Sequence, residues 1–337
     1  MKNIKTALII GANGQDASYM AEFLIEKGYI VHGTIRRNSV PESQTTRIEH
    51  LRSKNLITLH YMDLTDPISV ESIISSLKPD EIYHLAAQSH VQISFELPKY
   101  TLDVNAGGTL SVLEAVRKFS PKSKVYHAAT SEMFGNSISS DGFQREDTAF
   151  KPVSPYGCSK LYAHSLCNNY RNSYDMFICS GILFNHESPR RGINFVTNKV
   201  VLEAVKIKLG LSDELVLGNL NAYRDWGHAK DYIKGMWLML QQETPEDYVL
   251  ATGISHTVNE LVDYVFNKLN LDKDKYVKLD KKFERAEELH FLKGDSTKAR
   301  TELGWEIEYS FETMLDEMIE YWEEILTQKK EMLWVGY

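Results

Sequence analysis

Short runs of apolar, β-branched and aromatic residues recur through the first half of the chain and alternate with stretches of helical periodicity. The first run, residues 6–10, enters a glycine-rich turn, and 17–27 then carries Met20, Phe23 and Leu24 at helical spacing. This strand–helix alternation predicts an α/β fold with a doubly wound parallel sheet covered on both faces. Further strands are predicted at residues 30–35, 57–61, 81–85, 124–129 and 177–183, with helices between most of them, such as 105–119 and 156–174.

The alternation loosens after residue 185, where segments rich in Asn, Arg and Gly occur at 185–194 and 218–227 before a charged C-terminal third. The segment 226–241 has the pattern of a strand followed by a helix, so we expect it to return to the first domain. A smaller, discontinuous α/β lobe is expected from the rest of the second half. The expected division is a first domain of residues 1–184 that 226–250 rejoins, and a smaller lobe of residues 185–225 and 251–337. The residue pattern by itself predicts no role for the segments 38–54 and 273–293.

The composition of the 337-residue chain, with 43% hydrophobic and 25% charged residues, is that of an ordinary globular protein. Its net charge of −8 argues against a nucleic-acid-binding surface, so an anionic ligand would depend on a few placed Arg and Lys residues. Cys158, Cys167 and Cys179 have no metal-ligand spacing, and a small odd number of cysteines is typical of a reducing compartment. The chain shows neither a signal-peptide pattern nor the roughly 18 apolar residues in a row that a membrane helix needs. We therefore predict a cytoplasmic protein that binds no metal, nucleic acid or membrane.

The first predicted strand leads into Gly-Ala-Asn-Gly-Gln-Asp-Ala at residues 11–17, a G-x-x-G-x-x-A pattern between a strand and a helix. Glycines at such a turn let the backbone approach a pyrophosphate, and the start of the following helix offers free N–H groups and a partial positive charge. Ala17 in the third position still permits close packing of the helix on the strand. The pattern predicts a Rossmann-type dinucleotide site formed by Gly11, Asn13, Gly14, Gln15 and Asp16.

The residues after the second predicted strand favour NADP over NAD as the dinucleotide. An NAD-binding sheet places a carboxylate at this point for the ribose 2′-hydroxyl, whereas this chain has Arg36 and Arg37. Guanidinium groups pair well with a 2′-phosphate. The next two strand ends are predicted to contact the adenine through Asp63 and Leu64, and the pyrophosphate and nicotinamide ribose through Leu85 and Ala87.

Candidate catalytic residues follow the fifth strand and open a later helix. Tyr156 and Lys160 form a Y-x-x-x-K pair one helical turn apart, and an ammonium beside a phenol is expected to lower the pKa of the phenol and favour the phenolate, a general base. Thr130 and Glu132 come at the carboxyl end of the fifth strand, which faces the ligand crevice of a doubly wound sheet. Thr130 can hydrogen-bond a substrate oxygen, and Glu132 supplies a carboxylate that a simple alcohol dehydrogenase does not need.

These residues make the chain resemble the extended short-chain dehydrogenases that act on nucleotide sugars, and within them the GDP-mannose 4,6-dehydratase family. The resemblance covers nearly the whole chain, and the runs Asn-His-Glu-Ser-Pro-Arg-Arg-Gly and Arg-Asp-Trp-Gly-His-Ala are long and specific. It is carried by Tyr156, Lys160 and the stretches 14–22, 87–91, 130–132, 183–192, 224–232, 294–298 and 303–305.

The resemblance implies a GDP-sugar 4,6-dehydratase in which Thr130, Glu132, Tyr156 and Lys160 are catalytic. Tyr156 would take the proton of the C4 hydroxyl while hydride passes to NADP. Glu132 would then remove the C5 proton and protonate the departing C6 hydroxyl. Return of the hydride to C6 would give a 4-keto-6-deoxy sugar and restore the tightly bound NADP. The family's substrate contacts fall on Ser89, Asn185, Lys199, Arg224, Arg285 and Glu288.

The resemblance also implies a homodimer or homotetramer, because Arg191 and the turn 36–39 would help a neighbouring subunit bind the 2′-phosphate. The chain departs from the family pattern in residues 38–54, at Tyr223 and at Ala286. These departures leave the sugar open between GDP-mannose, a GDP-manno-heptose and GDP-N-acetylglucosamine. Two other functions are alternatives: a nucleotide-sugar 4-epimerase or 4-reductase, which needs no acid–base group at C5 and C6, and a non-catalytic NADP-sensing scaffold on the same fold.

Overall fold

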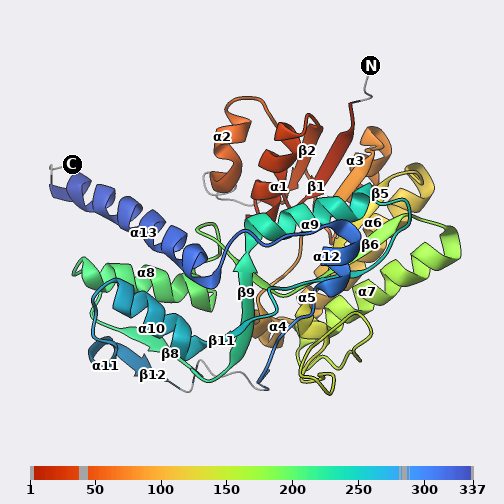
Figure 1. The fold of residues 1–337 in the computed structure, drawn as a ribbon. Coiled ribbons are helices and arrows are strands. Elements are labelled where there is room, and N and C mark those ends of the chain that lie inside the picture. The colour runs from red at the N-terminus through yellow and green to blue at the C-terminus, as the bar shows by residue number, and fades with distance from the viewer. Residues whose placement is uncertain (1–3, 38–44, 281, 283–286, 288, 335–337) are drawn as a thin grey trace.

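The larger of two units in the protein is built on a parallel sheet (Figure 1). The structure, a computed structural model, describes residues 4–37, 45–280, 282, 287 and 289–334. The strands of this sheet are β1 (Thr6–Ile10), β2 (Ile30–Ile35), β3 (Thr58–Tyr61), β4 (Glu81–His84), β5 (Lys124–Ala128), β6 (Ile178–Leu183) and β10 (Tyr248–Leu250). Within the described residues these seven strands pair in parallel in the order β10-β6-β5-β4-β1-β2-β3. The order reverses between β1 and β4, which is where a doubly wound sheet opens its ligand crevice.

Helices cover both faces of this sheet. Side chains of β1 alternate between two cores: Ala7 and Ile9 pack on one face, and Leu8 and Ile10 pack on the other. Because both faces are buried, the strands have continuous apolar sequences, and this explains why the sequence pattern located them. One face carries α1 (Gln15–Glu26), α9 (Ala229–Gln241) and α12 (Thr297–Leu303), and the other carries α3 (Pro67–Leu77), α6 (Gly108–Phe119) and α7 (Pro155–Tyr174).

The smaller unit combines two short sheets with three helices that lie together in Figure 1. Its strands are β7 (Asn185–Glu187), β8 (Leu215–Leu217), β9 (Tyr223–His228), β11 (Ser255–Thr257) and β12 (Val277–Leu279), and its helices are α8 (Val196–Lys208), α10 (Val258–Lys268) and α13 (Phe311–Trp334). The strands pair in the orders β11-β9-β7 and β12-β8. A single core, which includes the buried side chains of Trp226 and Phe266, holds β8, β9, β12 and the three helices together, and β7 and β11 pair with β9.

The chain returns from the smaller unit to the larger one. After β9 it forms α9 and then β10, which pairs with β6 at the edge of the large sheet. Helix α12 packs on α9 and β10, and Trp305 just beyond it donates its indole N–H to the carbonyl oxygen of Asp231 at 2.7 Å. The sequence-based division assigned residues 297–305 to the smaller lobe. They lie instead with the larger unit, because their apolar side chains complete its core.

Short elements make up the connections. Helix α2 (Glu49–Arg52) falls in the segment 38–54, and α11 (Lys273–Tyr276) precedes β12. Helices α4 (Val91–Glu96) and α5 (Pro98–Leu102) follow β4, and a π-helical turn at Asp103–Gly107 then continues into α6, so the predicted helix 105–119 begins with a π turn. Among the described residues, every helix is too short or too polar to cross a membrane.

Candidate active site

A cleft of about 1060 Å³ opens where the parallel strands end, and it is bounded on its other side by the smaller unit. Leu85 and Thr130 contribute from the strand ends, whereas Lys199 and Arg224 contribute from the smaller unit. The cleft thus brings together nearly all of the predicted site residues that the structure describes. They are Gly11, Asn13, Gly14, Gln15, Asp16, Arg36, Asp63, Leu64, Leu85, Ala87, Ser89, Thr130, Glu132, Tyr156, Lys160, Asn185, Arg191, Lys199 and Arg224.

The glycine turn after β1 approaches the backbone just beyond the end of β4. Gly11 has a φ of +89°, and a Cβ atom added to it would lie 2.9 Å from the Cα of Ala86. Its N–H donates to the hydroxyl of Thr34 at 3.2 Å. Gly14 precedes α1, and no side-chain hydrogen bond caps this helix, so its first amide groups can face an anion. The tight turn and the uncapped helix fit the pyrophosphate of a dinucleotide.

The two arginines after β2 differ in position. Arg36 lines the cleft, and its guanidinium donates to the hydroxyl of Tyr100, which lines the same cleft. Arg37 is not among the lining residues, and its guanidinium lies 5.7 Å from the ring centre of Tyr61. A third arginine, Arg47, donates to the carbonyl oxygen of Asn13 at 3.0 Å. The sequence did not single out Tyr100 or Arg47, because neither belongs to a motif and each meets its partner only in the folded chain.

The predicted catalytic residues converge in the cleft. A short 3-10 helix, Ser131–Met133, follows β5, and the hydroxyl of Thr130 accepts a hydrogen bond from the N–H of Glu132 at 3.3 Å. Ser154 caps α7 by accepting from the N–H of Gly157 at 3.0 Å, so α7 begins at a defined residue and Tyr156 lies in its first turn. The side chains of Thr130, Glu132 and Tyr156 are each 8% exposed, so solvent reaches them mainly through the cleft.

Burial has the largest effect on the pKa values of Tyr156 and Lys160. Desolvation raises the pKa of Tyr156 to about 12; its hydrogen bond with Thr130 opposes that shift, and the carboxylate of Glu132 adds to it. The expected lowering of this pKa was therefore wrong in direction, because helical spacing reveals the neighbour but not the loss of water. Desolvation also lowers the pKa of Lys160 to about 8. Its ammonium donates to the carbonyl oxygen of Ala128 at 2.9 Å.

The predicted substrate residues occupy the side of the cleft formed by the smaller unit. Arg224 is buried and donates to the carbonyl oxygen of Leu289 at 2.7 Å, and Lys199 donates to the carbonyl oxygen of Val216 at 2.6 Å. Both cations are therefore held by backbone carbonyls at the cleft wall. Asn185 stands at the start of β7, paired with β9. The predicted contacts Arg285 and Glu288 lie outside the described residues.

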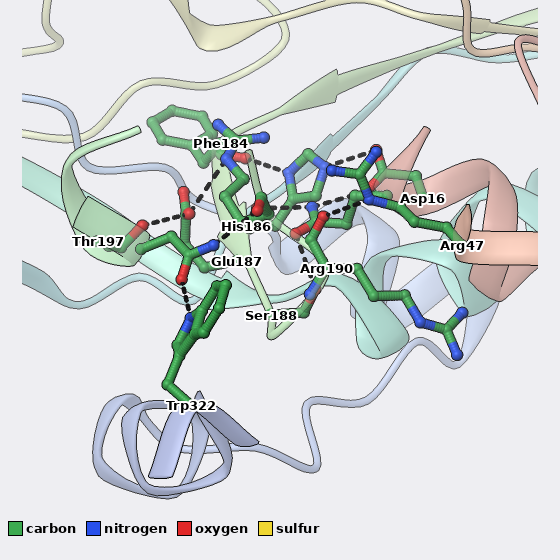
Figure 2. A network of polar contacts seen from close by, with 12 residues as sticks. Asp16, Arg47, Phe184, His186, Glu187, Ser188, Arg190, Thr197 and Trp322 are labelled. Carbon is green, nitrogen blue, oxygen red and sulfur yellow. Dashed lines mark hydrogen bonds and ion pairs between the residues drawn. The ribbon is translucent and has the colours of Figure 1, made fainter. Parts of the chain in front are cut away.

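The segment that follows β6 is bonded to the first helix, as Figure 2 shows. Nε2 of His186 lies 2.8 Å from a carboxylate oxygen of Asp16. Gln15 donates to the carbonyl oxygen of His186 at 3.1 Å and accepts from the hydroxyl of Ser188 at 2.8 Å. In the sequence, His186 is only one residue of a stretch that carries the family resemblance. Its cleft position and its partner could not be inferred, since Asp16 is 170 residues away.

Comparison with known proteins identifies the family. The model of the family described as GDP-mannose 4,6 dehydratase matches residues 8–318. The chain is 50% identical over 343 residues to GDP-mannose 4,6 dehydratase 2 of Arabidopsis thaliana, covering 99% of this chain and 91% of that protein. It is 47% identical over 338 residues to GDP-mannose 4,6 dehydratase of Homo sapiens, covering 93% and 90%. The crystal structure of a dTDP-glucose 4,6-dehydratase from Streptomyces venezuelae, with NAD bound, has the same fold, with a TM-score of 0.84 at 22% identity over 96% of this chain and 98% of that one. The chain belongs to the GDP-mannose 4,6-dehydratase family.

Proposed function

We propose that this enzyme removes water from GDP-mannose and forms the 4-keto-6-deoxy sugar nucleotide. The observation that carries the proposal is the presence of Glu132 beside Thr130 and Tyr156 in the cleft of a chain from this family. Epimerisation or reduction at C4 needs proton transfer at one oxygen only, from or to a single acid–base group. Elimination across C5 and C6 needs an additional acid–base group, which Glu132 supplies.

A nicotinamide cofactor fits the glycine turn and the uncapped start of α1, and we propose that it is NADP. Arg36 supports this choice, because it directs a guanidinium into the cleft at the point where an NAD site places a carboxylate. Arg47, which is held against the same turn, adds a second positive charge near it. The glycine turn and the start of α1 would hold this group, which would supply a hydride acceptor for C4 and a hydride donor for C6.

Tyr156 accepts the proton of the C4 hydroxyl in this scheme. Because burial raises the pKa of Tyr156 to about 12, the phenolate that starts the reaction needs stabilisation by its surroundings. The hydrogen bond with Thr130 and the positive charge of Arg191 act in this direction. Lys160 holds its ammonium at the floor of the cleft, one helical turn from Tyr156.

Glu132 acts on the two carbons beyond C4. Once C4 is a ketone, the C5 proton is acidic, and the Glu132 carboxylate removes it. The carboxylic acid formed in this way then protonates the C6 hydroxyl as it departs as water. Glu132 thus carries the C5 proton to the departing hydroxyl. When a hydride returns to C6, C5 takes up a proton of solvent origin, and Tyr156 releases the proton of the C4 hydroxyl to solvent, so that the protons balance.

The test is incubation of the purified enzyme with GDP-mannose in deuterated water, followed by mass spectrometry and NMR of the product. We expect a product lighter by one water that carries deuterium at C5. GDP-manno-heptose and GDP-N-acetylglucosamine are run in parallel to compare the sugars. A C4 epimer, or net consumption of NADPH, would contradict the proposal.

Glu132→Gln separates elimination from oxidation. We expect it to slow formation of the 4-keto-6-deoxy product by at least on the order of 10²-fold, because the positioned acid–base group is lost. A dead-end 4-keto sugar that retains its C6 hydroxyl should then be detectable. Glu96→Gln, which changes an exposed carboxylate, is the matched control and should keep wild-type turnover. Equal product formation by Glu132→Gln and the control would remove Glu132 from the mechanism.

A further inference from the structure

The ring of His186 lies between two hydrogen-bond acceptors. Nδ1 is 2.7 Å from the carbonyl oxygen of Phe184, and Nε2 is 2.8 Å from the carboxylate of Asp16. A neutral imidazole has only one N–H, so it can satisfy only one of these partners, whereas an imidazolium donates to both. His186 is 8% exposed, and the ring of Tyr232 stacks on its ring at 4.6 Å between centroids. A neutral ring would leave a buried oxygen without a donor, so the geometry requires a charged His186.

The titration behaviour of the pair agrees with this geometry. Burial alone would lower the pKa of His186, but the ion pair and hydrogen bond with Asp16 outweigh it and hold this pKa above its ordinary value. Burial alone would raise the pKa of Asp16, and His186 and Arg191 hold it below its ordinary value. Arg191, on the same segment, opposes the charge on His186.

The His186–Asp16 pair is one of several bonds that attach residues 185–192 to α1, and we call this set the clasp. Besides the two bonds of Gln15, Arg190 donates to the hydroxyl of Ser18 at 3.0 Å and to the carboxylate of Glu22 at 2.7 Å. Positions 15, 18 and 22 of α1 lie along one side of the helix, and Asp16 bonds the segment from the first turn beside them. The clasp therefore runs lengthwise along the helix that begins at the glycine turn.

Beyond the clasp, the same segment is bonded to the smaller unit (Figure 2). Arg191 pairs with Glu187 at 3.1 Å, and its carbonyl oxygen accepts from the side chain of Asn198 on α8 at 2.6 Å. Asn198 in turn accepts from the indole N–H of Trp322 on α13 at 2.6 Å. A continuous series of contacts thus connects the start of α1 with two helices of the smaller unit.

We propose that His186, as an imidazolium clasped by Asp16, is a positioning residue that fixes residues 185–192 between the cofactor turn and the sugar-nucleotide side of the cleft. Asn185 and Arg191, which flank it and line the cleft, take their orientation from this attachment. Loss of the charge on His186 leaves Asp16 without its partner and loosens the segment. The cofactor and the sugar nucleotide then both bind more weakly, whereas the groups that perform the chemistry remain in place. The part of this inference that concerns the sugar nucleotide rests on the proposed function.

The charge on His186 can be measured without any activity. In protein labelled with ¹⁵N-histidine, the signals of His186 are assigned among the 11 histidines by their loss in His186→Gln. We expect both ring nitrogens to show the chemical shifts of protonated nitrogen at pH 7.5. In Asp16→Asn, the two nitrogens should instead show the chemical shifts of a neutral ring. A neutral tautomer in the wild-type protein would overturn the proposal whatever the enzyme's substrate is.

Attachment of the segment is tested by trypsin, which cleaves after Arg190 and Arg191. Asp16→Asn and His186→Gln should each be cleaved there at least about tenfold faster than the wild type, with the same products. His256→Gln changes a histidine of the smaller unit that pairs with Glu260 at 3.5 Å outside the clasp, so it is the matched control and should behave as wild type. Circular dichroism before digestion separates local loosening from a failure to fold. Unchanged cleavage in both folded variants would contradict a positioning role.

Binding and turnover complete the test. Both variants should bind NADP at least about tenfold more weakly in calorimetry, and the KM for GDP-mannose should rise by a similar factor while kcat changes less than threefold. The double variant should be no worse than the poorer single one, because the two side chains act as one pair. A loss confined to kcat would mean that His186 takes part in the chemistry and would refute the positioning role. If GDP-mannose is not turned over at all, the NMR, proteolysis and NADP results still decide the proposal.

Discussion

Acid sensitivity of the sheet core is a quantitative consequence of a buried histidine, His84, on β4. The hydroxyl of Thr109 donates to the carbonyl oxygen of Asn105 at 2.7 Å, so Nε2 of His84, at 3.1 Å, donates to the oxygen of that hydroxyl. This assigns the neutral ring, with its lone pair on Nδ1, which has no hydrogen-bond partner among the described residues. The ring is 3% exposed and faces His127 on β5 at 5.6 Å between centroids. A proton added to Nδ1 would place an unpaired charge in the core.

The size of the stability loss in acid follows from the shifted pKa of His84. Burial, with a smaller contribution from the charge of Lys160, lowers the pKa of His84 from 6.5 to about 3. In the unfolded chain the ring takes up a proton below pH 6.5, whereas in the folded chain it stays neutral until about pH 3. The unfolded state therefore binds more protons in this window, and stability falls as the pH falls through it. At pH 5 the difference of 1.5 pH units corresponds to about 2 kcal/mol of lost stability from this one residue.

The assay compares wild type with His84→Asn by urea unfolding at pH 7.5 and pH 5.0. Asparagine can keep a hydrogen bond to Thr109 but does not titrate. All other groups titrate alike in both proteins, so the wild type should lose about 2 kcal/mol more than the variant between the two pH values. His290→Asn, which replaces an exposed histidine, should lose as much as the wild type. Equal losses in the wild type and His84→Asn would show that the core admits water or a proton at His84 and would refute the reasoning.

Two further predictions concern the cofactor site. Gly11→Ala combines a strained φ with a Cβ 2.9 Å from Ala86, whereas Gly28→Ala has a φ of +82° and nothing within 4 Å of its Cβ. We expect both variants to lose about 1–3 kcal/mol of stability in thermal unfolding. Only Gly11→Ala should weaken NADP binding, by at least about tenfold. Arg36→Ala should reduce the proposed preference for NADP over NAD in calorimetry by roughly tenfold or more. Arg37→Ala should leave it nearly unchanged, because Arg36 lines the cleft and Arg37 does not. Equal loss of NADP binding in the two glycine variants, or an equal change of cofactor preference in the two arginine variants, would contradict the geometric distinction.

The sequence predicted the sheet and most of the cleft for the same reason. Strands buried on both faces are continuous apolar runs, and parallel strands end at one edge, so Leu85 and Thr130 had to lie near the glycine turn at Gly11. What it missed depends on contacts between distant residues. Arg36 and Tyr100 are 64 positions apart, and neither periodicity nor spacing carries that information. The pKa of Tyr156 was misjudged because a helical repeat specifies neighbours but not how much water reaches them.

The repeated passage of the chain between the two units has a consequence for how the cleft can open. A body joined by one linker can swing freely about it, but here several strands and helices cross the boundary: β6 runs into β7, β9 into α9, and α12 returns before α13 leaves again. Rotation about any one crossing is resisted by the others, so entry and exit of a large ligand favour sliding of packed helices over a wide hinge. Exchange of whole lobes between related enzymes would likewise require several matched junctions, and a single splice would leave the large sheet without its edge strand β10.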